Sequence, residues 1–335
     1  MNLAIDPALP LAHAEALDRA KAAAASGPVF VVMNAGSGSG DAQARQDAIE
    51  SALKEAGRDY RFLIAMPGRS VAKLAREAAD AAQSEGGLVV AVGGDGTLSA
   101  VAQALSGSAT PLAVVPQGTF NYFGRAHGVP QDAGLATRAF LHGSIEPVQT
   151  GHLNGQVFLV NASLGLYPKL LEDREAYKQQ YGRSRLVAFA AGIATLLGWR
   201  GQMSLEAETR QARRVFRTTT LFVGNNQLQL ARVGLAAPQI EALERNLLTA
   251  VAVKPIRTGA LLWLLLRGLA GKLGEADNID SFSFHRMKVS PRGVRRVKVA
   301  LDGEVQWMRT PLLFEVAPHP LWLVVPAAED RAEVA

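Results

Sequence analysis

Short apolar runs and helix-length amphipathic segments alternate along the first third of the chain. The apolar runs lie at 28–34, 60–66, 88–94 and 111–116. The amphipathic segments between them lie at 41–56, 70–87 and 97–105. Runs of this length are typical of buried strands, and a spacing of three to four residues is typical of helices. The alternation predicts an α/β domain whose parallel sheet has helices on both faces.

The pattern changes after about residue 145, where strand-like runs become frequent and helical segments become few. The runs lie at 156–162, 218–224, 247–253, 282–289, 297–303, 311–317 and 320–326, and the helical segments at 184–199 and 258–273. This pattern predicts an antiparallel β-sandwich. The predicted domains are therefore an α/β domain at 1–147, a β-sandwich domain at 148–326 and a tail at 327–335.

The start of the chain predicts an amphipathic helix rather than a signal peptide. Residues 1–26 have no basic region before an apolar core, and Asp6, Glu15 and Asp18 interrupt the apolar positions. No segment has 18 continuous apolar residues, the length that a membrane span requires. The 335 residues contain no cysteine, which excludes disulfides and thiolate metal sites. We expect a cytoplasmic protein, or one peripheral to the inner face of the membrane.

Charge is distributed unevenly along the chain. Residues 1–150 contain 11 Lys+Arg and 14 Asp+Glu, whereas residues 151–335 contain 24 and 16, so the net charges are −3 and +8. A basic second half is suited to nucleic acid, an anionic membrane or a phosphorylated substrate. A solvated surface explains the charge equally well, so charge alone does not choose a partner.

Three glycine-rich junctions follow predicted strands, at NAGSGSG (34–40), GGDGT (93–97) and PQGTFN (116–121). Ligands of parallel sheets bind beyond the carboxyl ends of the strands. Glycine allows close approach of the backbone, and a helix N-terminus favours phosphate. Asp95 repels phosphate unless it binds Mg²⁺ or orients an attacking hydroxyl. These junctions predict a phosphate-binding site, although each alone is also typical of an ordinary tight turn.

The same residues carry a resemblance to known families. GGDGT resembles the signature of diacylglycerol, sphingosine and NAD kinases and of phosphofructokinases. NAGSGSGD resembles the Asn-Pro-x-Ser-Gly opening of the diacylglycerol kinase catalytic family, with Ala35 in place of proline. PQGTFNYFGR resembles that family's Pro-x-Gly-Thr-x-Asn-x-x-Ala-Arg segment, and ALDGE (300–304) its Asp-Gly-Glu motif. The resemblance runs in order from Pro28 to Pro326.

Members of this family transfer the γ-phosphoryl group of ATP to a lipid hydroxyl, in a cleft between an α/β domain and a β-sandwich. The resemblance implies nucleotide contacts from Asn34, Gly36, Ser37, Gly38, Gly93, Gly94, Asp95, Gly96, Thr97, Leu98, Thr119 and Asn121. It implies ATP and Mg²⁺ as cofactors, with Asp95 close to the metal of Mg-ATP. It leaves three candidates for the catalytic carboxylate, which are Asp302, Glu304 and Asp95.

The chain departs from the family pattern at two places. Ser99 and Ala100 replace an Asn-Glu pair of the family, which removes any nucleotide contact from that glutamate. Arg245 or Asn246 replaces an aspartate that holds a structural Mg²⁺ in bacterial relatives, and an arginine cannot ligate Mg²⁺. We predict that this metal site is absent and that the arginine's charge substitutes for it. Arg125 is a candidate phosphate contact, and the histidines have no metal-ligand spacing.

The leading hypothesis is an ATP-dependent lipid kinase that acts on diacylglycerol or a similar lipid alcohol. The segments 257–275, with Trp263, and 183–200 have apolar faces flanked by basic residues, which suits an interfacial helix, the sandwich surface or a homodimer face. The expected partners are a lipid at the membrane surface and a nucleotide, without nucleic acid. The alternatives are a kinase for a soluble acceptor, such as a dinucleotide or a sugar, and a non-catalytic nucleotide-binding regulator.

Overall fold

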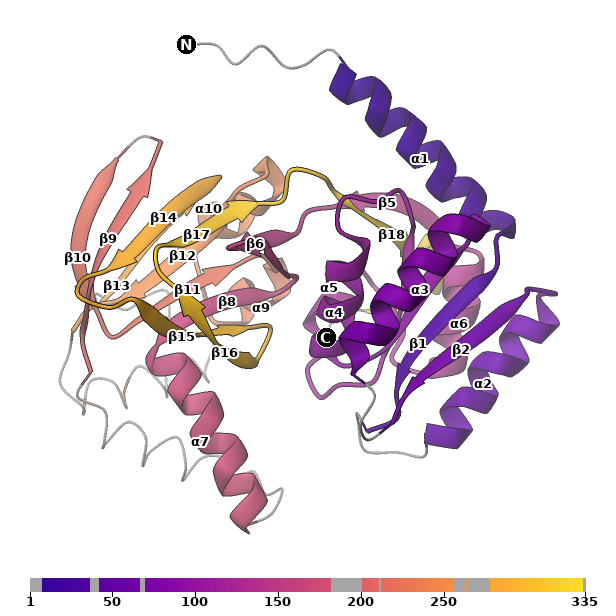
Figure 1. Ribbon diagram of the computed structural model, residues 1–335, viewed down its shortest axis with the longest axis horizontal. Helices are drawn as coiled ribbons and strands as arrows, with labels where there is room; N and C mark the ends of the chain where they lie inside the picture. The colour runs from indigo at the N-terminus through magenta and orange to yellow at the C-terminus, as the bar shows by residue number, and fades with distance from the viewer. Residues whose placement is uncertain are drawn as a thin grey trace. The chain divides into compact units, whose positions relative to one another are not determined.

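The protein divides into two compact units (Figure 1). The structure, a computed structural model, describes residues 8–36, 42–66, 70–181, 201–210, 212–255, 259, 263 and 278–333. Unit 1 comprises Met1–Gln149 and Pro318–Ala335, and unit 2 comprises Thr150–Ala317.

Unit 1 is built on one six-stranded sheet with the order β2-β1-β3-β4-β18-β5. Its strands are β1 (Val29–Asn34), β2 (Tyr60–Ala65), β3 (Leu88–Gly93), β4 (Leu112–Pro116), β5 (Ser144–Val148) and β18 (Leu321–Val325). All neighbours pair in parallel except β18 and β5, which are antiparallel. The predicted α/β domain with a parallel sheet is confirmed.

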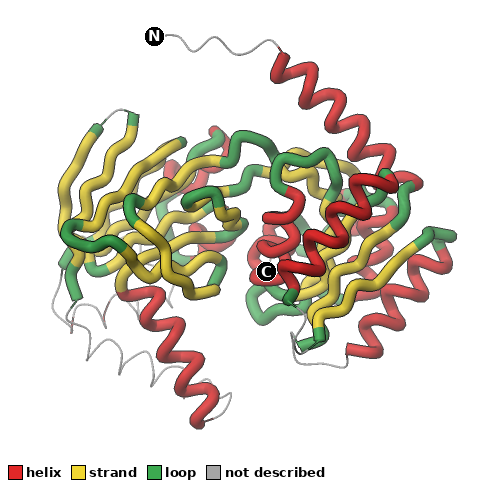
Figure 2. Tube along the Cα trace, viewed as in Figure 1, coloured by secondary structure: helices red, strands yellow, loops and turns green. Residues whose placement is uncertain are grey.

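Helices cover both faces of this sheet (Figure 2). They are α1 (Ala8–Ser26), α2 (Ala42–Glu55), α3 (Val71–Glu85), α4 (Asp95–Leu105), α5 (Tyr122–Ala126) and α6 (Ala133–Leu141). Helices α2 and α6 pack against the face that holds Val29, Val31 and Met33, whereas α3 and α4 pack together and α3 contacts β1. Strands β1, β3 and β4 are buried along their length because both faces are covered.

The last strand of the chain corrects the predicted domain boundaries. The sequence predicts that residues 320–326 belong to the sandwich domain at 148–326 and that a tail follows at 327–335. Instead, β18 lies between β4 and β5 in the sheet of unit 1, and the Ala332 N–H donates to the Gly128 carbonyl (2.8 Å). The physical reason is visible in the sequence, since LWLVV is continuously apolar and all five residues are buried. Such a run fits the interior of a sheet covered on both faces.

Unit 2 is a sandwich of two six-stranded sheets with the orders β10-β9-β14-β17-β6-β7 and β13-β12-β11-β8-β15-β16. Its strands are β6 (Gly151–Leu153), β7 (Gln156–Phe158), β8 (Asn161–Gly165), β9 (Met203–Thr209), β10 (Arg213–Thr218), β11 (Thr220–Gly224), β12 (Leu248–Val253), β13 (Ile279–Phe284), β14 (Arg286–Pro291), β15 (Arg296–Leu301), β16 (Glu304–Arg309) and β17 (Leu312–Val316). Every pairing is antiparallel, and one core lies between the sheets. The predicted antiparallel domain is confirmed.

Short helices lie on the outer face of the second sheet. They are α9 (Gln227–Arg232), α10 (Ala237–Glu241) and the 3₁₀ turn η1 (Leu243–Arg245), and a longer helix, α7 (Leu166–Tyr181), follows β8. Leu230 and Leu243 pack with Val251 of β12 to fix the short helices. The predicted helices at 184–199 and 258–273, and the membrane candidates 183–200 and 257–275, lie outside the described residues except for Gly259 and Trp263.

Candidate functional site

The three strands that lead into the glycine-rich junctions end at the same edge of the unit 1 sheet. Strands β1, β3 and β4 are parallel neighbours, and they end at Asn34, Gly93 and Pro116. The first loop begins with an Asx turn, in which the Gly36 N–H donates to Asn34 Oδ1 (3.1 Å). Ser37 and Gly38, two of the predicted nucleotide contacts, lie outside the described residues.

The second and third loops meet at two glycines. A Cβ atom on Gly118 would lie 2.9 Å from the Cα atom of Gly94 and 2.7 Å from Asn121 Oδ1. A Cβ atom on Gly94 would lie 3.2 Å from the Cα atom of Gly118. The Gln117 N–H also donates to the Gly93 carbonyl (2.8 Å). The two loops therefore approach backbone to backbone, and only glycine permits this contact.

Helix α4 begins at this contact without a side-chain N-cap, because its N-cap residue is Gly94. The N–H groups of Thr97 and Leu98 donate to the Gly94 carbonyl (2.9 and 3.1 Å). The side chains of Thr97 and Leu98 are buried and their N–H groups are already used within the helix, so an anion at this helix start would be bound by the N–H groups that precede them. The first N–H groups of a helix have no intrahelical acceptor and favour an anion.

Asn121 holds the third loop in shape. Its backbone is left-handed (φ 48°), and its Oδ1 accepts a hydrogen bond from the Gly118 N–H (2.7 Å). Its Nδ2 donates to Oε1 of Gln131 (2.7 Å), ten residues further along. Asn121 is buried, as a loop-shaping residue should be. Gln131 was missed in the sequence because nothing in its local pattern indicates this distant contact.

Asp95 joins the second loop to the third. Its Oδ1 accepts a hydrogen bond from the Phe123 N–H at 3.5 Å, and a carboxylate in the first turn of α4 is favoured by the helix dipole. Ser99, which replaces a family asparagine, turns back to its own helix and donates to the Asp95 carbonyl (2.9 Å). Asp95 is thus held between the glycine loops and the start of α5.

The third loop also presents aromatic side chains that the sequence motifs did not single out. Phe120 is exposed and its ring stacks on Tyr122, with centroids 5.6 Å apart and planes within 6°. A cavity of about 320 Å³ beside this loop is lined by Thr119, Phe120, Arg125, Val129, Gln131, Ala332 and Glu333. Arg125 and Thr119 therefore line the same cavity, and Ala332 and Glu333 near the C-terminus form another part of its wall.

His127 packs behind this loop. Its ring contacts the Phe123 ring edge-to-face, with centroids 4.9 Å apart. Burial and, to a smaller extent, the nearby charge of Arg331 together lower the pKa of His127 to about 4. The imidazole is neutral at pH 7. The ring serves the packing of unit 1.

The Asp-Gly-Glu motif forms the turn between β15 and β16 in unit 2. Leu301 pairs with Glu304, and Asp302 and Gly303 between them both have positive φ angles (45° and 91°). Two consecutive left-handed residues make a two-residue hairpin loop whose twist matches that of the strands.

The two carboxylates of this motif have different surroundings. Asp302 Oδ2 accepts from the Leu159 N–H (2.7 Å), and its Oδ1 accepts from the N–H groups of Val160 and Asn161 (2.8 and 2.9 Å). Glu304 is exposed, and its carboxylate forms no hydrogen bond or ion pair with any part of the chain that the structure describes. Asp302 therefore fixes the loop before β8, whereas Glu304 remains open to solvent.

No group of three or more His, Asp and Glu side chains within the described ranges is arranged to hold a metal ion. In the segment 243–250, Arg245 is exposed and Asn246 adopts a left-handed backbone (φ 58°) before β12. The absence of a structural metal there stays a prediction. No helix in the described part of the chain is long and apolar enough to cross a bilayer.

Comparisons with known proteins match this organisation. Residues 28–153 match the model of the diacylglycerol kinase catalytic domain. A probable lipid kinase YegS-like from Pseudomonas aeruginosa is 36% identical over 126 residues, which cover 37% of this chain and 40% of that protein. A diacylglycerol kinase from Bacillus subtilis is 37% identical over 99 residues, 29% of this chain and 33% of that protein. The match thus spans at most about two fifths of these relatives.

A solved structure extends the likeness to both units. A putative diacylglycerol kinase from Bacillus anthracis str. Sterne superposes with a TM-score of 0.71 at 20% identity, covering 91% of this chain and 99% of that one. At this identity the likeness shows the fold alone. Together, the comparisons confirm the resemblance that the motifs predict: the chain carries the pattern of the diacylglycerol kinase catalytic family, matched by the family model at residues 28–153.

Proposed function

We propose that the protein is an ATP-dependent lipid kinase that transfers the γ-phosphoryl group to the hydroxyl of diacylglycerol or a similar lipid alcohol. The observation that carries this proposal is the contact between Gly94 and Gly118, which joins two backbone loops at the start of α4. Phosphoryl transfer depends on positioning and charge neutralisation, which such loops supply. The match of residues 28–153 to the diacylglycerol kinase catalytic domain supports the same reaction.

Residues of unit 1 fit Mg-ATP. Backbone N–H groups of the glycine loops and of the first turn of α4 would hold the phosphates. Mg²⁺ is commonly bound by one or two carboxylates together with substrate phosphates, and Asp95 is the carboxylate placed between these loops. The metal would neutralise charge on the transferring phosphoryl group.

Within the Asp-Gly-Glu motif, we assign the role of general base to Glu304. A base must have a carboxylate oxygen available to the hydroxyl proton. Both oxygens of Asp302 already accept backbone N–H groups, whereas the carboxylate of Glu304 is exposed. Asp302 would then hold the hairpin that carries Glu304, and both residues would be needed for different reasons.

The test is transfer of labelled γ-phosphate from ATP to a panel of lipid alcohols in neutral detergent micelles. Glu304→Gln should abolish most of the transfer while ATP binding persists. Glu329→Gln makes the same chemical change at an exposed site of unit 1 and should leave transfer unchanged. If no lipid is labelled while ATP still binds, the acceptor is soluble or the protein is a regulator, and the proposal is wrong.

A further inference from the structure

Unit 2 carries a strongly basic segment that the proposed reaction does not use. Residues 286–300 contain six Lys and Arg side chains and no Asp or Glu. The segment runs from β14 through a turn into β15, and Arg292, Arg295 and Arg296 are exposed on and beside this turn. A cationic turn of this kind is a surface that attracts anions.

Strand pairing adds a fourth arginine to this surface. Arg296 of β15 lies directly opposite Arg309 of β16. Thr310, the next residue, donates its N–H to the Arg295 carbonyl (3.1 Å) and its hydroxyl to the Val294 carbonyl (2.6 Å). Arg292, Arg295, Arg296 and Arg309 are called the arginine patch below. Like charges opposite each other destabilise a sheet, so this pairing is unfavourable unless an anion lies over it.

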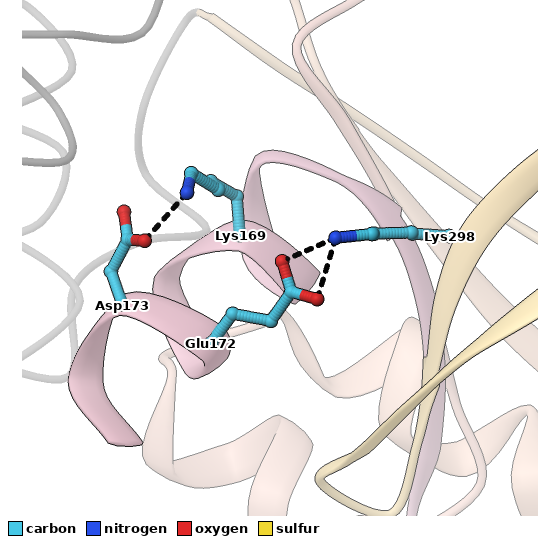
Figure 3. A network of polar contacts seen from close by, with 4 residues as sticks. All are labelled: Lys169, Glu172, Asp173 and Lys298. Atoms are coloured by element: carbon cyan, nitrogen blue, oxygen red, sulfur yellow. Dashed lines mark hydrogen bonds and ion pairs between the residues drawn. The ribbon is translucent and has the colours of Figure 1, made fainter. Parts of the chain in front are cut away.

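Several other surface cations of unit 2 have acidic partners. Their shortest N–O separations are 2.6 Å for Arg213–Glu206, 3.0 Å for Lys254–Asp280 and 3.3 Å for Arg286–Glu315. Lys298, next to the arginine patch, is held by both carboxylate oxygens of Glu172 from α7 at 2.7 and 2.8 Å (Figure 3). By contrast, no carboxylate of the described residues forms an ion pair with any member of the arginine patch.

Two exposed apolar side chains flank the arginine patch. Val294, in the turn itself, is 43% exposed, and Trp307 of β16 is 56% exposed. Lys298 lies opposite Trp307, with its Nζ 5.4 Å from the ring centroid. This pair is two residues from the Arg296–Arg309 pair, so both pairs share a face, which is opposite to the core face of Val299 and Met308. Tryptophan beside basic residues is typical of the membrane–water interface.

We propose that the arginine patch, with Val294 and Trp307, docks unit 2 on a bilayer that contains anionic lipids. The proposal rests on the proposed function, since a kinase whose acceptor is a lipid alcohol acts at a bilayer. Guanidinium groups pair with lipid phosphates, and basic clusters gain affinity from the negative surface potential of such membranes. A nucleic acid also presents phosphates, and its bases can stack on Trp307. It offers no apolar layer to cover the aliphatic side chain of Val294, whereas a bilayer covers both side chains.

The test is co-sedimentation of the full chain with phosphatidylcholine vesicles that contain about 30% phosphatidylglycerol, compared with pure phosphatidylcholine vesicles. The wild type should prefer the anionic vesicles, and added salt should weaken the binding. Arg295→Glu/Arg296→Glu should lower the partition coefficient about tenfold or more, because each reversal replaces an attraction with a repulsion. Trp307→Ala should lower it about threefold through the lost interfacial contact.

A matched control makes the same change in net charge elsewhere. Lys73 and Arg76 are exposed on α3, so Lys73→Glu/Arg76→Glu should change vesicle binding less than about twofold. The patch variant should fold, because Arg296→Glu places a carboxylate opposite Arg309 and removes the like-charge pair. Circular dichroism and the melting temperature check this.

Three outcomes would overturn the docking proposal. They are equal binding of the anionic vesicles by the wild type and the patch variant, no preference of the wild type for anionic vesicles, and binding of an RNA oligonucleotide through the same arginines without vesicle binding. Transfer in neutral micelles separates this proposal from the kinase proposal. The patch variant should keep that transfer, and its absence in the wild type contradicts the kinase proposal alone.

Discussion

Unit 1 and unit 2 hold their candidate functional groups in opposite ways. In unit 1 the key contact is between the backbones of Gly94 and Gly118, and the groups offered to a ligand are mainly N–H groups at the start of α4. In unit 2 the groups are side chains, such as Glu304 on a hairpin and the arginine patch on a turn. We therefore expect Gly94 and Gly118 to tolerate no added side-chain atom, and Glu304 and the arginine patch to be sensitive mainly to a change of charge.

The two units also differ in net charge. Unit 1 contains 12 Lys+Arg and 17 Asp+Glu, for a net charge of −5, and unit 2 contains 23 and 13, for a net charge of +10. A site made of N–H groups needs few cationic side chains, because each peptide dipole supplies a partial positive charge. A bilayer surface offers no fixed geometry to match, so the local concentration of positive charge on one surface matters more there than the exact position of each side chain.

The largest expected effect concerns Glu304, the side-chain group of unit 2 that we assign as the base. Glu304→Gln removes the open carboxylate without changing its size, so the turnover number should fall about 1000-fold. The melting temperature should not change, because the exposed Glu304 carboxylate makes no hydrogen bond or ion pair in the described structure. Steady-state kinetics in neutral micelles measures the first effect. Full activity of this variant would move the base to Asp302 or Asp95.

Gly118→Ala tests the backbone contact between Gly94 and Gly118 in unit 1. The added Cβ would lie 2.7 Å from Asn121 Oδ1 and 2.9 Å from Gly94 Cα, so the two loops must separate. A displacement of this size should lower the specificity constant for ATP about 100-fold. Gly134→Ala is the matched control, since its Cβ would meet no atom closer than 3.4 Å. Wild-type kinetics for Gly118→Ala would show that the glycine contact has no catalytic importance.

Asp302→Asn separates a structural carboxylate from a catalytic one. An asparagine keeps one acceptor oxygen but turns an NH₂ group toward an N–H donor among those of Leu159, Val160 and Asn161. The free energy of unfolding of unit 2 should fall by about 2 kcal/mol. Hydrogen exchange of peptides covering 156–165 should accelerate. An unchanged exchange rate with lost activity would instead make Asp302 the catalytic carboxylate.

The smallest expected effect is a pH dependence confined to unit 1. His127 has a folded pKa of about 4, lowered from 6.5 mainly by burial. The unfolded chain therefore binds the proton first as the pH falls, so the stabilisation from neutral His127 is complete above pH 6.5 and is lost toward pH 4. Because the residue is partly exposed, we expect a loss of about 1–2 kcal/mol.

This effect is measured by following the melting temperature of the wild type and of His127→Gln between pH 4 and pH 7.5. The variant should start lower at neutral pH, since it loses the ring contact with Phe123, and should show a shallower decline on acidification. Parallel pH profiles for the two proteins would mean that His127 does not titrate in this range.

Much of the fold could be predicted because it depends on local pattern. The strands at 28–34, 88–94 and 111–116 are continuous apolar runs, and the structure has them as β1, β3 and β4. Strand β18 has the same continuous apolar pattern. Because it follows the sandwich strands closely in the sequence, the pattern predicts it in the sandwich domain, whereas the structure places it in the sheet of unit 1. The sheet that a strand joins depends on a pairing partner that can lie anywhere in the chain, and here β4 precedes β18 by about 200 residues.

The candidate site divides in the same way. The sequence by itself determined the glycine turns, the Asp-Gly-Glu hairpin and the family resemblance, because each depends on residues that are adjacent in the chain. Only the tertiary structure decided that Gly94 meets Gly118, that Gln131 holds Asn121, that Asp302 is engaged while Glu304 is open, and that Arg296 lies opposite Arg309. Backbone conformation is encoded locally, whereas contact between side chains and loops is set by sheet register and packing, which no short stretch of sequence contains.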